Sequence, residues 1–170
     1  MDAIQAVKAA YAGAQVWYNG TVAGLTSEQA NEVPPGVAHP IGELQAHILH
    51  SIDGLVNMVC RGQQSIWERD GWGAKLGVPM MMRHDTESAR AFRVDPAQLE
   101  GYAAAVFGEF YAYLDALTPA DLDGEVDFGP GLGKMTLGGF LLNPLLGNTF
   151  AHTGEISALK GLQGQRGYPF

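Results

Sequence analysis

Three polar residues near the end of the chain, Asn148, His152 and Glu155, are of types that bind metal ions or transfer protons. An α-helix turns about 100° per residue, so their spacing places them on one side of a helix. That side also carries four apolar residues, Leu141, Leu145, Ile156 and Leu159. The stripe is therefore predicted to face a core, where imidazole, carboxamide and carboxylate groups are costly unless partners satisfy them. A metal ion is one such partner.

Two further histidines, His47 and His50, lie on an earlier segment that carries an isoleucine, leucine and valine stripe. On a helical wheel, His47 lies about 100° from the centre of that stripe and His50 about 160° from it. We therefore expect His47 at the edge of the core, beside a cavity, and His50 on the surface. Spacing alone leaves two interpretations of His47 and His152: both bind one ion, or each is a histidine satisfied at the core edge.

Four long amphipathic segments must position these side chains. Apolar residues recur at three- and four-residue steps over residues 2–25, 40–61, 95–117 and 136–162. Asp95 followed by Pro96 is typical of a helix start, Thr136 is a capping residue, and Pro144 is expected to kink the last helix or mark its effective start. With almost no strand signal, the pattern predicts an all-α four-helix bundle that forms a single domain over residues 1–170.

Two links between these segments are long enough to cross the bundle. The first, residues 63–95, contains Trp67, Trp72 and the run Met80–Met82, which either line a pocket mouth, cover the bundle or pack in a dimer contact. We expect a short helix near its start, at residues 64–69. The second link, residues 124–133, is glycine-rich, and we expect residues 125–128 to be extended. Its segment Gly129–Gly133 lacks the lysine and hydroxyl pair of a phosphate-binding loop, so we interpret that segment as flexible.

The bulk composition restricts the partners and the compartment. The net charge of −8 argues against nucleic acid and anionic membranes as partners, because both attract positive surfaces. No apolar run approaches the ~20 residues that a membrane-spanning helix needs. A single cysteine, Cys60, excludes an intrachain disulfide and favours a reducing compartment. We therefore expect a cytoplasmic protein that acts on a small molecule.

The residues described above resemble the DinB family of bacterial four-helix proteins. Three stretches carry the likeness, Pro40–Leu49, Trp67–Pro79 and Asn148–Ile156. The first is similar to a Glu-Leu-x-x-His segment of the family, and the second to the crossover in members near maleylpyruvate isomerase. The third is similar to the family motif His-x-x-x-His-x-Gly-Gln-Ile. The likeness covers most of the chain in order and spacing.

The resemblance implies an up-down-down-up bundle with long crossover connections, often dimeric. It also implies a divalent metal ion, zinc or nickel, held by three side chains, which by position are His47, Asn148 and His152. The middle ligand is a glutamate in the thiol-dependent branch and a histidine in many other members, whereas this chain has Asn148. The glutamine of the family motif is replaced by Glu155, which we interpret as a fourth ligand, as a group that orients a ligand, or as a catalytic general base that relays protons.

Two functions of different classes fit this reading. The first is a metal-dependent thiol S-transferase, isomerase or hydrolase, in which the ion activates water or a small thiol such as mycothiol, bacillithiol or glutathione. The second is a non-catalytic, small-molecule-binding or stress-associated bundle that has lost strong metal binding, with Asn148 and His152 bonded to each other or to water. A purely structural bundle kept for dimerisation ranks last, since unsatisfied buried polar groups cost about 1–3 kcal/mol each.

Overall fold

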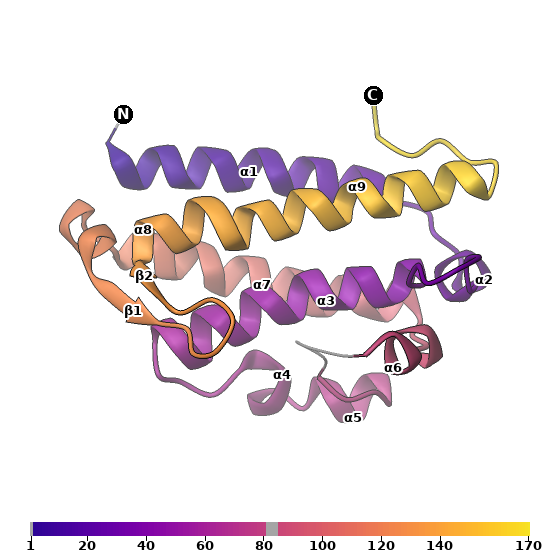
Figure 1. Ribbon diagram of the computed structural model, residues 1–170, viewed down its shortest axis with the longest axis horizontal. Coiled ribbons are helices and arrows are strands. Elements are labelled where there is room, and N and C mark those ends of the chain that lie inside the picture. Colours follow the sequence, from indigo (N-terminus) through magenta and orange to yellow (C-terminus); the bar gives the residue numbers. More distant parts are fainter. Residues whose placement is uncertain (1, 81–84) are drawn as a thin grey trace.

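The computed structural model describes residues 2–80 and 85–170 and is a bundle of long helices (Figure 1). Four helices form its frame: α1 (Ala3–Val22), α3 (Ile41–Asp53), α7 (Pro96–Ala116) and α9 (Leu146–Leu162). Figure 1 shows α1 and α9 running in one direction and α3 and α7 running back. Helix α9 packs between α1 and α3, and α7 packs against α3 and α1. This is the predicted all-α, up-down-down-up arrangement.

The helix starts follow from capping residues near the predicted positions. The Asp2 carboxylate accepts a hydrogen bond from the Gln5 backbone N–H at 2.9 Å, and so caps α1. Asp95 caps α7, with Pro96 at the first helical position, where its missing N–H costs nothing. Thr136 caps the short helix α8 (Leu137–Phe140), which begins the last helical run. The predicted starts of the third and fourth helices are thereby confirmed.

Two helical runs widen into π-helical segments that the sequence pattern did not predict. Helix α3 continues as η1 (Gly54–Cys60), and η3 (Leu141–Leu145) lies between α8 and α9. A π-helix bonds each N–H to the carbonyl five residues earlier, which changes the register of everything that follows. Pro144 lies inside η3, and α9 begins two residues after it. The last helical run therefore passes Pro144 through a wider turn.

Short helices fill the crossover between α3 and α7 and cover one side of α3. They are α4 (Ile66–Arg69), α5 (Trp72–Leu76) and α6 (Thr86–Ala91). The Asp53 carboxylate, 1% exposed, accepts hydrogen bonds from the backbone N–H groups of Ile66 and Trp67 at 2.8 and 2.9 Å, and from the Tyr102 hydroxyl at 2.8 Å. One carboxylate thus joins α3, the start of α4, and α7. Trp67 is buried and covers the bundle; Met81 and Met82 lie outside the described residues.

His50 is buried, so the expectation that it lies on the surface is wrong. Its exposed fraction is 0%, and its ring packs edge-on against Trp67 with centroids 4.4 Å apart. The helical wheel correctly predicted that His50 lies on the side of α3 away from its main apolar stripe. That side is nevertheless covered, because α4 folds back over it, and a single-helix wheel contains no information about such a cover.

A β-hairpin precedes the last helical run, where the sequence predicted a flexible link. Strands β1 (Glu125–Asp127) and β2 (Lys134–Thr136) pair antiparallel, with Val126 opposite Met135. The turn is ordered: Phe128 N–H donates to the Gly133 carbonyl at 2.9 Å, and Gly133 N–H to the Gly129 carbonyl at 2.8 Å. Gly129 and Gly133 have φ near +70°, which favours glycine at both positions. Two further short elements, α2 (Ser27–Asn31) and η2 (Pro119–Asp123), complete the chain.

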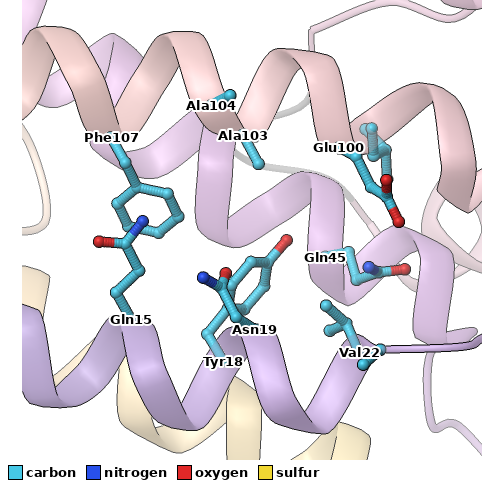
Figure 2. A pocket seen from close by; sticks show the side chains of 11 residues that line it. Gln15, Tyr18, Asn19, Val22, Gln45, Glu100, Ala103, Ala104 and Phe107 are labelled. Atoms are coloured by element: carbon cyan, nitrogen blue, oxygen red, sulfur yellow. The ribbon is translucent and has the colours of Figure 1, made fainter.

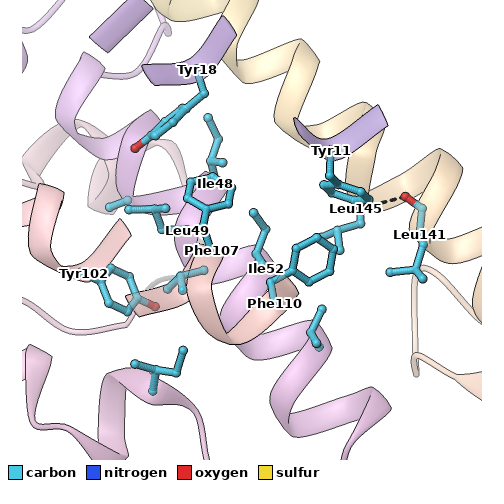
Figure 3. Packing of buried hydrophobic residues seen from close by; sticks show 14 of the residues in the cluster. Tyr11, Tyr18, Ile48, Leu49, Ile52, Tyr102, Phe107, Phe110, Leu141 and Leu145 are labelled. Carbon is cyan, nitrogen blue, oxygen red and sulfur yellow. Dashed lines mark hydrogen bonds between the residues drawn. The ribbon is translucent and has the colours of Figure 1, made fainter. Parts of the chain in front are cut away.

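Aromatic and aliphatic side chains from all four long helices fill the interior (Figure 3). Tyr11 of α1 packs edge-on against Phe110 of α7, with ring centroids 4.5 Å apart. Its hydroxyl donates to the backbone carbonyl of Leu141 at 2.7 Å, the dashed line in Figure 3. This bond ties the first helix to the π segment before α9. Within residues 2–80 and 85–170, no helix combines the length and apolar character that crossing a membrane requires.

Candidate metal centre

The three predicted ligands lie together where α3 packs against α9. The rings of His47 and His152 are edge-to-face, with centroids 4.8 Å apart and planes at 85°. Asn148 Nδ2 lies 3.3 Å from His47 Nε2. All three side chains are partly buried at the edge of the core. The structure therefore brings His47, Asn148 and His152 into one cluster.

The separations within this cluster suit the donor atoms of a single ion. Nitrogen and oxygen ligands bind zinc at about 2.0–2.2 Å, which places neighbouring donors roughly 3–3.5 Å apart. The amide of Asn148 lies at that distance from His47 Nε2. Asn148 Oδ1 is buried and has no hydrogen-bond partner among the described residues. Because amide oxygen and nitrogen exchange places on a half-turn, the same side chain offers an oxygen donor there.

Glu155 orients His152 from outside the cluster. Its Oε2 lies 2.7 Å from His152 Nδ1, which leaves Nε2 as the ring nitrogen that faces a metal, a common arrangement around metal-binding histidines. The hydrogen bond from His152 lowers the pKa of Glu155, although burial acts in the opposite direction. Glu155 is therefore a carboxylate at neutral pH.

Glu155 is exposed, so the prediction that the whole polar stripe faces the core is only partly correct. The apolar members of the stripe, Leu141, Leu145, Ile156 and Leu159, are buried. Asn148 and His152 are half-buried, and the Glu155 side chain is 57% exposed. Along α9, the polar residues of the stripe therefore lie at the edge of the core, and the Glu155 carboxylate faces solvent.

The donor set is neutral and rich in nitrogen. In the part of the chain that the structure describes, no three side chains of His, Cys, Asp or Glu gather in a way that could hold a metal ion. The candidate ligands are two imidazoles and one carboxamide. Imidazole suits zinc, nickel, copper and iron, whereas calcium and magnesium prefer carboxylate and carbonyl oxygen. The residues therefore fit a transition metal, with no charged side chain among the direct donors.

A second polar pair, His39 and Glu43, lies beside the cluster. His39 Nδ1 and Glu43 Oε2 are 2.9 Å apart, and Glu43 is 1% exposed. Burial raises the pKa of Glu43 to about 8, and the negative charge of Glu155 adds to the shift. Burial also lowers the pKa of His39. The four-residue spacing from His39 to Glu43 is the signal in the sequence for this pair.

Two cavities open on either side of the cluster. One, of about 270 Å³, is lined by His47 and Asn148, by apolar residues of η1 and η3, and by Gly131 and Leu132 of the hairpin turn. The other, of about 440 Å³, is lined by His39, His152 and Glu155 among others. The hairpin turn, predicted to be a flexible link, therefore forms a wall of the site.

Comparison with known proteins identifies the family. The family model described as the DinB superfamily matches residues 14–145, which is well over half of the chain. The chain belongs to the DinB superfamily. The match includes His47 and ends before Asn148 and His152. The assignment of the last two residues as candidate ligands therefore depends on the geometry described above. The resemblance seen in the sequence is thereby confirmed at the level of the family.

The DinB assignment agrees with a solved structure. The chain is similar to the crystal structure of a "conserved protein of locus" from Enterococcus faecalis, with a TM-score of 0.80 and 20% identity. The alignment covers 95% of this chain and 97% of that one, so the two share a fold over nearly their whole length. No curated protein matches the sequence.

Proposed function

We propose that this DinB-superfamily protein binds one zinc or nickel ion through His47, Asn148 and His152, and uses it in a thiol transfer or isomerisation on a small molecule. The supporting observation is the convergence of three donors from two helices, with a centroid separation of 4.8 Å between the rings and 3.3 Å between Asn148 Nδ2 and His47 Nε2. Helices hold these side chains on a rigid frame, so little reorganisation accompanies binding.

The bound ion and Glu155 have different roles in the proposed reaction. A bound divalent ion lowers the pKa of a thiol or of water and so supplies a nucleophile at neutral pH. Glu155 Oε2 accepts the Nδ1–H of His152, which fixes the ring so that Nε2 points at the ion. Because Glu155 is exposed, it also exchanges protons with solvent, and we assign it the role of proton relay.

The cavity of about 270 Å³ next to His47 and Asn148 is where we place the substrate. Leu55, Leu132 and Leu145 make most of its wall apolar. Its volume is near the lower limit for small-molecule sites, which are usually about 300–1,000 Å³. The proposed substrate is therefore a compact molecule with an apolar body, held against the hairpin turn.

Metal content tests the proposal directly. The purified protein is stripped with a chelator, reloaded with zinc or nickel, desalted and measured by elemental analysis. We expect one ion per chain in the wild type and a loss of stoichiometric metal in His47→Ala and His152→Ala. Ser51→Ala is the matched control, because Ser51 lines the same cavity next to His47 without belonging to the donor set. A wild-type protein without stoichiometric zinc or nickel, or equal metal content in all variants, contradicts the proposal.

A non-catalytic binding protein is the second candidate, and the His47–Asn148 contact favours it. With the amide nitrogen facing His47 Nε2, the two side chains share a hydrogen bond that needs no ion. A neutral donor set also binds metal more weakly than one with a carboxylate. On this alternative, His47→Ala leaves metal content unchanged, whereas on the first proposal the ion is lost.

We also propose that the protein forms a homodimer. Trp17 of α1 and Phe150 of α9 are 36% and 38% exposed and contact each other, with ring centroids 5.9 Å apart. Exposed aromatic residues of this kind are enriched in protein interfaces. Light scattering during size-exclusion chromatography should give twice the chain mass, and Trp17→Ala should shift the protein toward monomer. A monomeric wild type rules the dimer out.

A further inference from the structure

A cavity separate from the metal centre lies between α1 and α7 (Figure 2). Its volume is about 330 Å³, and none of the candidate metal ligands lines it. Helix α3 reaches both sites. Gln45 is two residues before His47, or about 200° around the helix, so the two side chains point to opposite sides of α3. Gln45 lines this second cavity and His47 the first.

One end of the second cavity presents a buried hydrogen-bond acceptor. Gln45 is 3% exposed, and its Oε1 is buried without a hydrogen-bond partner among the described residues. Burial raises the pKa of the neighbouring Tyr18, the Gln45 amide lowers it in part, and the charge of Glu100 raises it further. Tyr18, Gln45 and Glu100 all line this cavity. An unsatisfied buried carbonyl is costly, and an N–H or O–H donor would relieve that cost.

The carboxylate of Glu100 lies at the same end of the cavity as Gln45 (Figure 2). Glu100 is the single charged residue among the described residues that line the cavity. No lysine or arginine is among the described residues that line the cavity, so its two acceptors favour a ligand that carries positive charge. The net charge of −8 favours the same sign at long range.

The rest of the lining suits a flat apolar group. Phe107 and Tyr18 form an aromatic wall, with ring centroids 5.8 Å apart. Ala103 and Ala104 of α7 are small, which leaves the space between α1 and α7 open. Figure 2 shows Phe107 at the end of the cavity away from Gln45 and Glu100.

We propose that this cavity binds a small organic cation with a primary ammonium group and a flat apolar body. The ammonium group has three donors. It lies between the Glu100 carboxylate and Gln45 Oε1, and the apolar body lies against Phe107 and Ala103. The site is independent of the metal centre, so ligand binding here does not require His47 or His152.

Three probes with the same ring and linker test the charge preference: tryptamine, tryptophol and indole-3-propionate. They carry an ammonium, a hydroxyl and a carboxylate group in turn. Isothermal titration calorimetry on the full chain should show tryptamine binding in the millimolar range or tighter. Tryptophol should bind more weakly, and indole-3-propionate most weakly of the three. Added salt should weaken the binding of tryptamine more than that of tryptophol.

Two variants test whether the ligand binds in this cavity. Glu100 is exposed at the rim of the cavity, so Glu100→Gln should weaken tryptamine by about two- to fivefold. Tryptophol binding should stay nearly unchanged, because only the ammonium uses the carboxylate charge. Glu87→Gln, an exposed acid on α6, is the control with the same change in net charge. Gln45→Leu should weaken both probes, since it removes the shared acceptor. Leucine has a similar volume and removes a buried unsatisfied amide, so the variant should stay folded.

Several results would overturn the proposal. One is equal affinity for tryptamine and indole-3-propionate; another is an effect of Glu100→Gln no larger than that of Glu87→Gln. The absence of binding for every probe at millimolar concentration would mean a water-filled cavity only. Retained tryptamine affinity in Gln45→Leu, with a folded protein by circular dichroism, would place the ligand elsewhere.

Discussion

Asn148 Nδ2 and His47 Nε2 lie 3.3 Å apart although 101 positions separate the two residues in the chain. When the amide nitrogen of Asn148 is the donor, Nε2 of His47 is the acceptor and the ring proton is on Nδ1. The same Nε2 is the proposed metal donor. A half-turn of the Asn148 amide therefore separates a hydrogen-bonded pair from a pair of metal ligands, and substitutions at Asn148 are the most direct probe of the site.

Replacing Asn148 with histidine should raise zinc affinity by about tenfold or more, because imidazole is a better donor than a carboxamide for this metal. Asn148→Leu should remove the third donor and weaken binding. Competition against a chromophoric zinc chelator measures both. If Asn148→His binds zinc no more tightly than the wild type, position 148 does not face the ion.

Replacing Glu155 with glutamine should weaken metal binding by about 10–100-fold, the usual cost of losing a carboxylate behind a metal-binding histidine. Glutamine keeps an oxygen that accepts the His152 Nδ1–H and loses the charge. Glu125→Gln, on the exposed hairpin, is the control for net charge. Equal zinc affinity in the two variants would show that Glu155 does not support His152.

Glu43 should make the protein less stable as the pH rises. Its pKa is about 8 in the folded protein against 4.5 in the unfolded chain, so the folded state holds an extra proton between these values. The associated stability is fully present below about pH 4.5 and is lost as the pH rises from there through 8, with a total on the order of 5 kcal/mol. Urea unfolding at several pH values should show a steeper decline in the wild type than in Glu43→Gln. Parallel curves would contradict the raised pKa.

Asp53→Asn should destabilise the protein by about 2–4 kcal/mol, because hydrogen bonds to a buried charge contribute about 1.5–3 kcal/mol each. The carboxylate accepts from Ile66, Trp67 and Tyr102. Tyr102→Phe removes one of these bonds and should cost less than Asp53→Asn. Urea unfolding measures both free energies. A neutral Asp53→Asn would show that the crossover is held by the packing of Trp67 alone.

Two glycines of α1 form a matched pair for testing the C-terminal tail. A Cβ at Gly20 would lie 2.5 Å from Pro169 Cβ, whereas a Cβ at Gly13 would meet nothing within 4 Å. Gly13→Ala should stabilise the helix by up to about 1 kcal/mol. Gly20→Ala should lose that gain by displacing the tail from Trp17, which Tyr168 and Phe170 contact. Thermal unfolding and a red shift of tryptophan emission report the difference; equal behaviour of the two variants would contradict tail docking.

The sequence predicted the helical frame and the proximity of His47, Asn148 and His152 for identifiable reasons. The apolar periodicity and the caps at Asp95 and Thr136 define long helices, and these features depend on local sequence. The four-residue spacing of Asn148 and His152 predicts a shared face in any helix. Their approach to His47 depends on which helices are neighbours, and the resemblance to the DinB family supplied that information.

Other features depend on contacts between distant segments and left no local signal. The burial of His50 depends on α4, which folds back over α3 after a turn. The cavity between α1 and α7 combines Gln45 and Glu100, whose spacing along the chain follows no motif. The π segments change the helical register without an unusual composition, apart from Pro144. The sequence indicated extended chain at residues 125–128, where β1 lies, but three-residue strands are too short for alternation to predict their pairing in a hairpin.

The side-by-side packing of α1 and α9 has a consequence for synthesis on the ribosome. Helix α1 leaves the ribosome well before its main neighbour α9, and the Tyr11 hydroxyl bonds to a carbonyl 130 positions later in the chain. Contacts of such high sequence separation form late, and apolar surface exposed in the meantime favours aggregation. The apolar face of α1 should therefore need shielding until α9 has been translated.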